Sequence, residues 1–599
     1  MPFDGLTLYT VTRELKEHLT GSRIERIYQP AALEIILVCR RYREKYHLLA
    51  AATADAARVH LTEGDHRNPA KIPFFCSTLR RHLEGCRISE IIQPGLERIL
   101  YLTAAGTDAA GRPVTYQLIT EIMGKHSNII LVEAAQNKIV DAIKRYSHAL
   151  SRHREVLPGQ PYVPPPATGK KDPRATSAEE FTADLVACGS ASAAAVAIQR
   201  TYEGFSLFSA REIVYRAELP PDITLGECGL YEFRRLYLAF RDLVTAVIAG
   251  TATPTLALTN GVPVDFAPFT SAQLGGEQIQ GPLNRLIDRF YAARAEITAF
   301  RAKKQRLTDI ITREIKRLNR KLEEVTGLLA DTTCDRYRLW GELLTANLYR
   351  LKAGTKEAIL ENYYTPDLTP VVIPLDPSLT PAENAQRYFR KYAKARTARA
   401  YAAEEKERLE MELAYLASVA TAVEQATDLS DLAEIAGELE REGYLTTEPM
   451  PSKPAPSKKK KDSPQPVKFS ACDGCTILVG KNNRQNDYVT FRLAAPEDIW
   501  LHARGIPGAH VILKCGGQDP SPEALAEAAA LAAYFSRARH SKNVPVDWTY
   551  RANVERPKGA RPGFVTYTGE KTIYADPAAA VKFLQGRGGD KTSSLNPQP

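Results

Sequence analysis

Two long stretches of this chain repeat apolar residues at steps of three and four, and they constrain the fold more than any other feature. The first begins near Leu283 and continues to Leu329, and the second extends from Pro381 to about Val423. This spacing is typical of long helices with a coiled-coil seam, so it predicts an antiparallel coiled-coil arm formed by residues 283–336 and 380–440. An arm of about 45 residues has a length on the order of 65 Å, which suits a protein that spans a large partner. A dimerisation rod is the alternative.

A smaller unit, residues 337–379, separates the two helical stretches, so we expect a middle domain at the tip of the arm. It contains a helix-like segment, LWGELLTANLYRL, and a proline-punctuated segment with strand character, YYTPDLTPVVIPL. The chain has 599 residues, which exceeds what one core usually organises, and several domains are therefore predicted.

Residues 1–162 are dominated by short apolar or alternating runs, from RIERIYQP to NIILVEA, bounded by Gly, Pro, Asn and Asp. They predict a mixed α/β sheet domain, with helices at TLYTVTRELKEHL and PFFCSTLRRHLE. After an extended linker at Leu157–Pro173, residues 174–252 form a helical module. Residues 254–282 contain Asn260-Gly261 between apolar alternations, a hairpin signal that we expect to return the chain to the first sheet.

A second boundary follows the arm. Residues 446–468 are rich in Pro, Ser and Lys, so a disordered basic linker is predicted there. Residues 469–577 form a C-terminal α+β domain with strands at TILVG, YVTFRL, IWLHA and HVILK, a helix at SPEALAEAAALAAYFSRAR, and returning strands at DWTYRA and FVTYTG. Residues 586–599 are expected to form a disordered tail. The fold class is therefore a multidomain α+β protein.

Basic residues are concentrated on the predicted arm, although the net charge of the whole chain is only +9. Residues 301–321 carry nine Lys or Arg against Asp309 and Glu314, and no acid lies between Arg387 and Arg399. Such one-sign stripes suit an RNA backbone better than a membrane surface, because a coiled-coil seam interrupts them. The residues chosen as candidate ribosome contacts are Arg313, Lys316, Arg317, Arg320, Arg387, Arg390, Lys391 and Lys394.

Two stretches near the C-terminus have the composition of a recognition surface: GKNNRQND at 480–487 and DIWLHARGIPGAHVIL at 498–513. Amides, rings and basic groups beside flexible glycines suit looped or single-stranded RNA. A well-packed hairpin with an ordinary buried Trp is the alternative. The candidates are Lys481, Asn482, Asn483, Arg484, Trp500, His502, Arg504 and His510, with a further basic edge at Arg556, Lys558 and Arg561.

The composition excludes several classes of function. No apolar run is long enough for a transmembrane helix, and MPFDGLTLYT lacks the features of a secretory signal, so we expect a cytoplasmic protein without membrane contact. Nine scattered cysteines indicate reduced thiols, and Cys472 with Cys475 lacks the second pair that a zinc site needs. No P-loop, metal cluster or catalytic triad is evident, so no cofactor and no enzymatic activity are predicted.

The two C-terminal motifs, together with MPFDGLTL, GLERIL, EIMGKHSNIIL and GELLTANLY, resemble motifs of the NFACT family in family order. The resemblance covers nearly the whole chain. It implies a helix-hairpin-helix-like character for the helical module and an RNA-binding C-terminal domain. It also implies a tRNA-binding face at Asp4, Glu97, Arg98, Glu121, Ile122, Met123, Lys125 and His126. Glu97 stands where the family commonly has Asp; without the resemblance, Glu97-Arg98 would be read as surface decoration, and EIMGKHSNIIL equally as an internally packed hairpin.

The resemblance further implies a function. The protein would bind a stalled large (50S) ribosomal subunit that carries peptidyl-tRNA, recruit alanyl-tRNA and direct template-independent alanine tailing of the nascent chain. Its partners would be rRNA, the two tRNAs and a small RNA-binding auxiliary factor. A surface fibronectin-binding adhesin is the alternative, as the family's older description implies. A third reading, a nucleic-acid-processing C-terminal domain, depends on His502 and His510, which form no recognisable triad.

Overall fold

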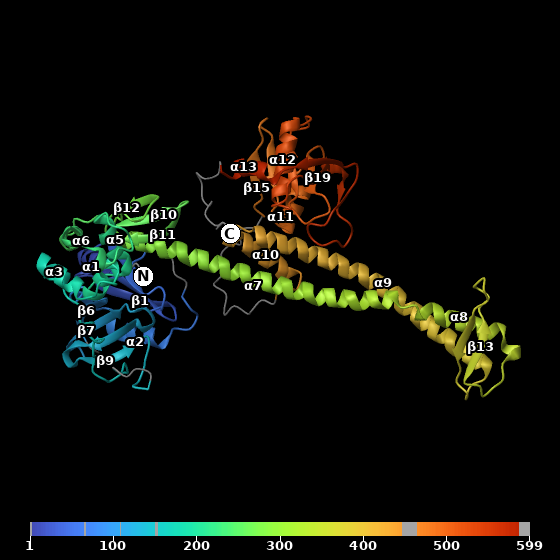
Figure 1. The fold of residues 1–599 in the computed structure, drawn as a ribbon, viewed down its shortest axis with the longest axis horizontal. Coiled ribbons are helices and arrows are strands. Elements are labelled where there is room, and N and C mark those ends of the chain that lie inside the picture. The colour runs from blue at the N-terminus through green and yellow to red at the C-terminus, as the bar shows by residue number, and fades with distance from the viewer. Residues whose placement is uncertain (1–2, 65–67, 108–109, 150–153, 446–463, 586–599) are drawn as a thin grey trace. The chain divides into compact units, whose positions relative to one another are not determined.

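The computed structural model describes the chain except residues 1–2, 65–67, 108–109, 150–153, 446–463 and 586–599, so most of the predicted linker and the predicted tail lie outside the described residues. The chain forms two compact units, one from Met1 to Ile297 and one from Thr298 to Thr592. Figure 1 shows the elements of each unit. The α+β fold class is confirmed, with a sheet domain near each end of the chain and long helices between them in sequence.

The first unit is built on a nine-stranded sheet in the order β4-β3-β2-β1-β5-β6-β7-β8-β9. All of its pairings are antiparallel, and neighbours in the sheet are neighbours in sequence except at β1 and β5. The strand bounds are β1 Arg23–Ala31, β2 Glu34–Arg41, β3 Glu44–Ala51, β4 Arg58–Leu61, β5 Arg87–Ile92, β6 Ile99–Thr107, β7 Pro113–Glu121, β8 Asn128–Glu133 and β9 Lys138–Ala142.

The two predicted helices of this domain are present as α1, Gly5–Leu19, and α2, Phe74–Leu83. Each buries an apolar stripe at helical spacing, for example Leu8, Val11, Leu15 and Leu19 on α1. These side chains share one core with the sheet.

The predicted hairpin is also present, but it does not join the first sheet. Strands β10 (Thr255–Thr259), β11 (Val262–Ala267) and β12 (Glu277–Gln280) form a separate three-stranded sheet. Since β11 and β12 occupy both edges of β10, that strand has no edge left for the larger sheet. Its side chains nevertheless pack in the same core as α1. The turn is as expected, with positive φ at Asn260 (51°) and Gly261 (77°).

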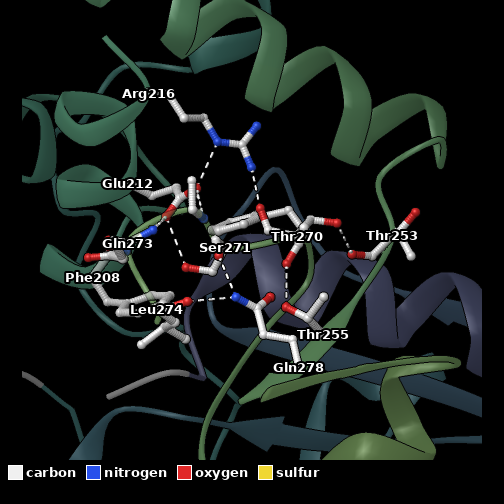
Figure 2. A network of polar contacts seen from close by, with 12 residues as sticks. Phe208, Glu212, Arg216, Thr253, Thr255, Thr270, Ser271, Gln273, Leu274 and Gln278 are labelled. Atoms are coloured by element: carbon white, nitrogen blue, oxygen red, sulfur yellow. Dashed lines mark hydrogen bonds and ion pairs between the residues drawn. The ribbon is translucent and has the colours of Figure 1, made fainter. Parts of the chain in front are cut away.

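The helical module consists of α3 (Ala178–Val186), α4 (Ala194–Thr201), α5 (Leu207–Arg216) and α6 (Leu230–Ala249) around an aromatic core. Figure 2 shows how α5 is tied to the loop before β12. The buried carboxylate of Glu212 accepts hydrogen bonds from Ser271 Oγ (2.9 Å), Ala272 N (2.8 Å) and Arg216 Nε (2.8 Å). This network fixes the end of the hairpin segment against the module.

The arm of the second unit is formed by α7, Leu283–Ala330, and α9, Pro381–Gln425, which lie side by side in Figure 1. Lys304 Nζ donates to the Glu424 carbonyl (2.6 Å), and Lys321 Nζ lies 2.5 Å from Glu405 Oε1. The partner of the later residue on α7, Lys321, lies earlier on α9 than the partner of Lys304. The helices are therefore antiparallel, as predicted. Buried residues recur every seven positions, at 311, 318 and 325 on α7 and at 402, 409, 416 and 423 on α9. Helix α10, Leu429–Arg441, follows.

The middle domain contains α8 (Thr333–Ala346) and a hairpin of β13 (Glu357–Glu361) and β14 (Pro370–Pro374). Only the second half of YYTPDLTPVVIPL is a strand, because its first half forms the connection in which Leu368 has a positive φ of 46°. Gly341 allows the close approach of the arm, since a Cβ there would lie 3.0 Å from the ring of Phe389.

The C-terminal domain has a six-stranded antiparallel sheet in the order β15-β16-β18-β17-β19-β22, packed against α12, Pro522–Tyr534. The strands are β15 Val467–Ser470, β16 Thr476–Val479, β17 Ile499–Ala503, β18 Val511–Lys514, β19 Val544–Tyr550 and β22 Lys571–Ala575. A separate pair, β20 (Val554–Glu555) and β21 (Thr566–Tyr567), accounts for part of FVTYTG.

The strand predicted at YVTFRL is wrong. Helix α11, Asn483–Tyr488, is followed by a π-helical turn over Val489–Leu493. The physical reason is a local cap: the Asn482 side chain accepts a hydrogen bond from Gln485 N (2.8 Å) and starts a helix that continues through the apolar residues.

Candidate nucleic-acid interfaces

Asp4 is buried and holds two helices. Its Oδ1 accepts from Thr7 N (3.0 Å) and caps α1, while Oδ2 accepts from Ser206 N (3.1 Å), Ser206 Oγ (2.7 Å) and Ser209 Oγ at the start of α5. The neighbouring Gly5 has no room for a side chain, because a Cβ would lie 2.0 Å from the Leu96 carbonyl oxygen. The structure therefore places Asp4 at the joint between the sheet and the helical module, beneath the surface.

Glu97 and Arg98 lie in the loop between β5 and β6, close to that joint. Gln93 Nε2 supports this loop by donating to the carbonyls of Gly5 (3.0 Å) and Glu97 (2.8 Å). Glu97 is half-buried and Arg98 is exposed. The pair is thus held on a well-supported loop with the guanidinium free to contact a ligand.

Two residues that the sequence prediction missed, Lys170 and Glu203, stand beside this pair. Burial raises the pKa of Glu97, and the nearby charge of Glu203 adds to the effect, while Arg98 and Lys170 oppose it. Burial lowers the pKa of Lys170, and Arg98 lowers it further. We call Glu97, Arg98, Lys170 and Glu203 the charged cluster. Its members come from both modules, and nothing in the local sequence around Lys170 or Glu203 indicates the association.

The motif EIMGKHSNIIL divides into a buried and an exposed half. Glu121 is fully buried, and its carboxylate binds Arg154 through two contacts of 2.7 and 2.5 Å and Tyr162 Oη at 3.0 Å. Ile122 belongs to the core of the sheet domain. Met123 is half-buried, and its N–H donates to Ser127 Oγ (2.8 Å).

Lys125 and His126 are exposed on the short helical turn Gly124–His126. The Ile122 N–H donates to the Arg98 carbonyl (2.9 Å), so this turn follows directly from a backbone contact with the Glu97-Arg98 loop. The structure thus brings Arg98, Lys125 and His126 to one end of the sheet, and it leaves Asp4, Glu121 and Ile122 inside.

Most of the basic candidates on the arm are exposed. Arg317 pairs with Glu314 (2.8 Å), Arg387 pairs with Asp376 (2.6 Å), and Lys391 lies over the rings of Tyr337 and Tyr388. Among the described residues, no ion pair within 4.0 Å is found for the remaining five, which are Arg313, Lys316, Arg320, Arg390 and Lys394. These five cations are available to a polyanion.

The GKNNRQND motif docks the C-terminal domain on the arm. Lys481 pairs with Asp431 of α10 (2.7 Å), and Asn482 Nδ2 donates to Glu434 of the same helix (2.9 Å). Asn483 Nδ2 donates to Glu438 Oε1 (3.0 Å) and to Ser418 Oγ of α9 (2.9 Å). These groups face protein acids in this arrangement instead of solvent. Arg484 is half-buried.

Trp500 is fully buried, so its ring cannot stack on a base without rearrangement of the domain. The His510 ring is also buried and makes a 2.9 Å contact from Nδ1 to Thr490 Oγ1. Burial lowers the pKa of both neighbouring imidazoles, that of His502 to about 4, so both are neutral at physiological pH. His502 keeps part of its surface exposed, and the exposed Arg504 pairs with the buried Asp547 (3.0 Å).

The described residues contain no group of three or more His, Cys, Asp or Glu side chains placed to hold a metal ion. All nine cysteines are free thiols. In the part of the chain that the structure covers, no helix has the length and apolar character needed to cross a membrane.

Comparison with known proteins agrees with this architecture. Residues 4–462 match the family described as NFACT N-terminal and middle domains, and residues 466–570 match the NFACT protein RNA binding domain. The chain thus joins a sheet-and-arm scaffold to an RNA-binding domain. It belongs to the NFACT family, as its motifs indicated.

The chain is 36% identical to "Rqc2 homolog RqcH" of Bacillus subtilis over 580 residues, which cover 97% of this chain and 98% of the relative. It is also 36% identical to the Streptococcus suis protein of the same name over 579 residues, covering 96% and 98%. Among solved structures, the N-terminal part of the fibronectin/fibrinogen-binding protein from Streptococcus suis is 31% identical and covers 48% of this chain and 99% of that one, with a TM-score of 0.41.

Proposed function

We propose that this protein is a cytoplasmic ribosome quality-control factor. It binds large ribosomal subunits that carry peptidyl-tRNA and recruits alanyl-tRNA, so that alanine is added to the nascent chain without a template. The proposal rests on the near full-length similarity to the RqcH relatives. The charged cluster at the junction of two modules, in which Arg98 is exposed and the other three members are half-buried, is the single structural observation that most favours it.

The protein would act by positioning, and the ribosome would form the peptide bond. Arg98 can donate two hydrogen bonds to a base edge, while the adjacent Glu97 carboxylate accepts from a base amino group. The exposed Lys125 and His126 lie near enough in the fold to contact phosphates beside that base. The unpaired cations of the arm would contact rRNA, with a small RNA-binding auxiliary factor as a further partner.

The test is the RNA recovered with the purified full-length protein. Replacing Glu97 and Arg98 together by Ala removes the proposed base contacts, so we expect about a tenfold loss of recovered tRNA. Recovery of large subunits stays close to that of the wild type, because the arm is unchanged. Sequencing the RNA identifies which tRNA is bound.

The double substitution of Arg241 and Asp242 by Ala is the matched control. These residues form an exposed ion pair (3.0 Å) on α6 of the same unit, so their loss removes equal numbers of opposite charges. Unchanged tRNA recovery after loss of Glu97 and Arg98 would contradict the assignment.

A second candidate function is that of a fibronectin-binding adhesin. It is favoured by the name of the Streptococcus suis structure, which shares about a third of its residues over half of this chain. Cell fractionation with a fibronectin pull-down separates the two candidates: an adhesin is recovered at the cell surface, and a quality-control factor sediments with ribosomal subunits.

A further inference from the structure

A cavity of about 490 Å³ lies between α9 and the loop of residues 557–564, both in the second unit. Of the candidate RNA contacts, Lys558 and Arg561 of the predicted basic edge line it, and none of those on the arm or in GKNNRQND does. The lining side chains that determine its chemistry are Arg408, Met411, Tyr415, Lys558, Arg561 and Phe564. Cavities of this size suit small ligands or single groups of a larger one.

The inner wall is held in place by Arg561. Its guanidinium lies 4.7 Å from the centre of the Tyr415 ring and 5.4 Å from that of Tyr444, and it donates to Tyr444 Oη (2.6 Å). Glu412, at 3.8 Å, balances the charge. Arg561 therefore serves the wall and is not available to a ligand.

The loop itself is anchored from the C-terminal domain. Gly563 N donates to Asp487 Oδ1 (2.9 Å), and Arg556 pairs with the other oxygen of that carboxylate (3.0 Å). Gly563 has a positive φ of 80°, and a Cβ there would lie 2.6 Å from Asn483 Oδ1, so glycine is required. A loop held in this way loses little conformational freedom when a ligand binds.

The mouth combines apolar faces with positive charge. Phe564 is 45% exposed and Met411 is 52% exposed, although both could have been buried in a purely structural joint. The exposed Lys558 has no ion pair among the described residues. The Arg408 side chain is 65% exposed but pairs with Glu405 (2.6 Å), so Lys558 is the cation at the mouth that is available to a ligand. A ligand with a flat ring and a negative group fits this mouth, because the ring can pack on the apolar side chains while the negative group contacts the positive charge.

We propose that this pocket binds the base of an unpaired RNA nucleotide. The base packs between Phe564 and Met411, and its phosphate lies at the mouth against Lys558. The family match places residues 466–570, and therefore this loop, in an RNA-binding domain. The inference rests on the proposed function only for the source of the RNA, and it stands apart from the charged cluster.

The experiment uses the full-length protein and a short single-stranded oligoribonucleotide that contains one 2-aminopurine. Transfer of the probe base from stacking on its neighbours into the pocket changes its fluorescence. Phe564→Ala abolishes this change and weakens binding by at least about fivefold, the range expected for one stacked base. Lys558→Ala weakens binding and lowers its salt dependence, because one phosphate contact is lost. A duplex with the same sequence shows no change in fluorescence when the protein is added.

Tyr574→Ala and Lys582→Ala are the matched controls, since both residues are exposed in the same domain and neither lines the cavity. Both are expected to bind the probe as the wild type does. Binding by Phe564→Ala within about twofold of the wild type, with the fluorescence change retained, overturns the proposal. Binding of an acidic, Phe-containing peptide is measured with the same variants. If the peptide requires Phe564 for binding and the RNA does not, the pocket is a protein-binding site and the proposal is overturned.

Co-sedimentation with large subunits is measured on the same samples. If the wild type does not sediment with large subunits, the proposed function is wrong. The oligonucleotide measurement still tests independently whether the pocket binds an RNA base.

Discussion

Glu121 illustrates how a residue within a family motif can serve the fold. Its carboxylate, the Arg154 guanidinium and Tyr162 Oη form a buried ion pair with an additional hydrogen bond at the end of β7. The Arg154 side chain is only 7% exposed. Loss of one partner would leave the other charge buried without compensation, which is far more costly than the loss of a surface pair.

We therefore expect Glu121→Ala to destabilise the sheet domain by about 3–5 kcal/mol. Amide hydrogen exchange of β7 and β8 in the intact protein measures this locally, and it avoids a two-state treatment of a multidomain chain. The variant with both Glu121→Ala and Arg154→Met is the control: it is more stable than the single variant, because no unpaired charge remains. Equal exchange in Glu121→Ala and the wild type would contradict a structural role.

Only half of the charged cluster could be predicted from the sequence. Glu97 and Arg98 were found because they are adjacent and stand in a family motif. Lys170 and Glu203 lie far from them along the chain, and only the packing of the helical module on the sheet places them nearby. Asp4 was predicted as an RNA contact, whereas its partners Ser206 and Ser209 could not be known before the fold.

The predicted helices agree with the structure where an apolar repeat extends over many residues. The heptads of α7 and α9 were predictable because each additional turn repeats the same signal. Residues 488–493 were not predictable, since a run of six residues carries no clear period and the cap at Asn482 determined the outcome. The docking of GKNNRQND on α10 had no local signal, because amide side chains suit protein and RNA acceptors equally.

The contact between Asn483 and Glu438 makes the docking of the C-terminal domain on α10 dependent on pH. Burial raises the pKa of Glu438 above its ordinary value, although hydrogen bonds from Asn483 and Tyr415 oppose the shift. When the domain is undocked, the part of this burial that the C-terminal domain supplies is lost, so the pKa of the Glu438 carboxyl falls toward its ordinary value. Between the two pKa values the docked state binds more protons than the undocked state, so docking weakens as the pH rises through the raised value.

We expect hydrogen exchange of α10 amides, corrected for the intrinsic pH dependence, to be slower at pH 5.5 than at pH 8. Glu438→Gln keeps a neutral hydrogen-bonding side chain, so this variant should lose the difference while it retains the dock. A pH dependence that persists unchanged in Glu438→Gln would assign the effect to another group.

At the scale of the whole molecule, the proposed function requires that the second unit reach a fixed distance along a ribosomal subunit. The arm offers a direct test because its pairing is known, with Lys321 opposite Glu405. Deletion of residues 319–325 from α7 and 401–407 from α9 removes one matched heptad. It shortens the arm by about 10 Å and keeps the seam in register.

The shortened protein is expected to fold and to bring down tRNA as before, because the charged cluster is in the other unit, but to bind large subunits at least about tenfold more weakly. Gradient sedimentation measures the second effect. The control replaces the same two segments with another heptad pair that restores the length. Subunit binding that is insensitive to the deletion would mean that the arm does not span its partner.

The double cap at Asp4 has a consequence for how this chain is made. Asp4 leaves the peptide exit tunnel long before Ser206, which fixes its second carboxylate oxygen and is 202 positions further on. Similarly, Glu14 accepts from Leu283 N, 269 positions away. During synthesis, the contacts of α1 are therefore complete only after the residues up to Leu283 have followed it, and a nascent chain that stops before Leu283 would present this helix without them.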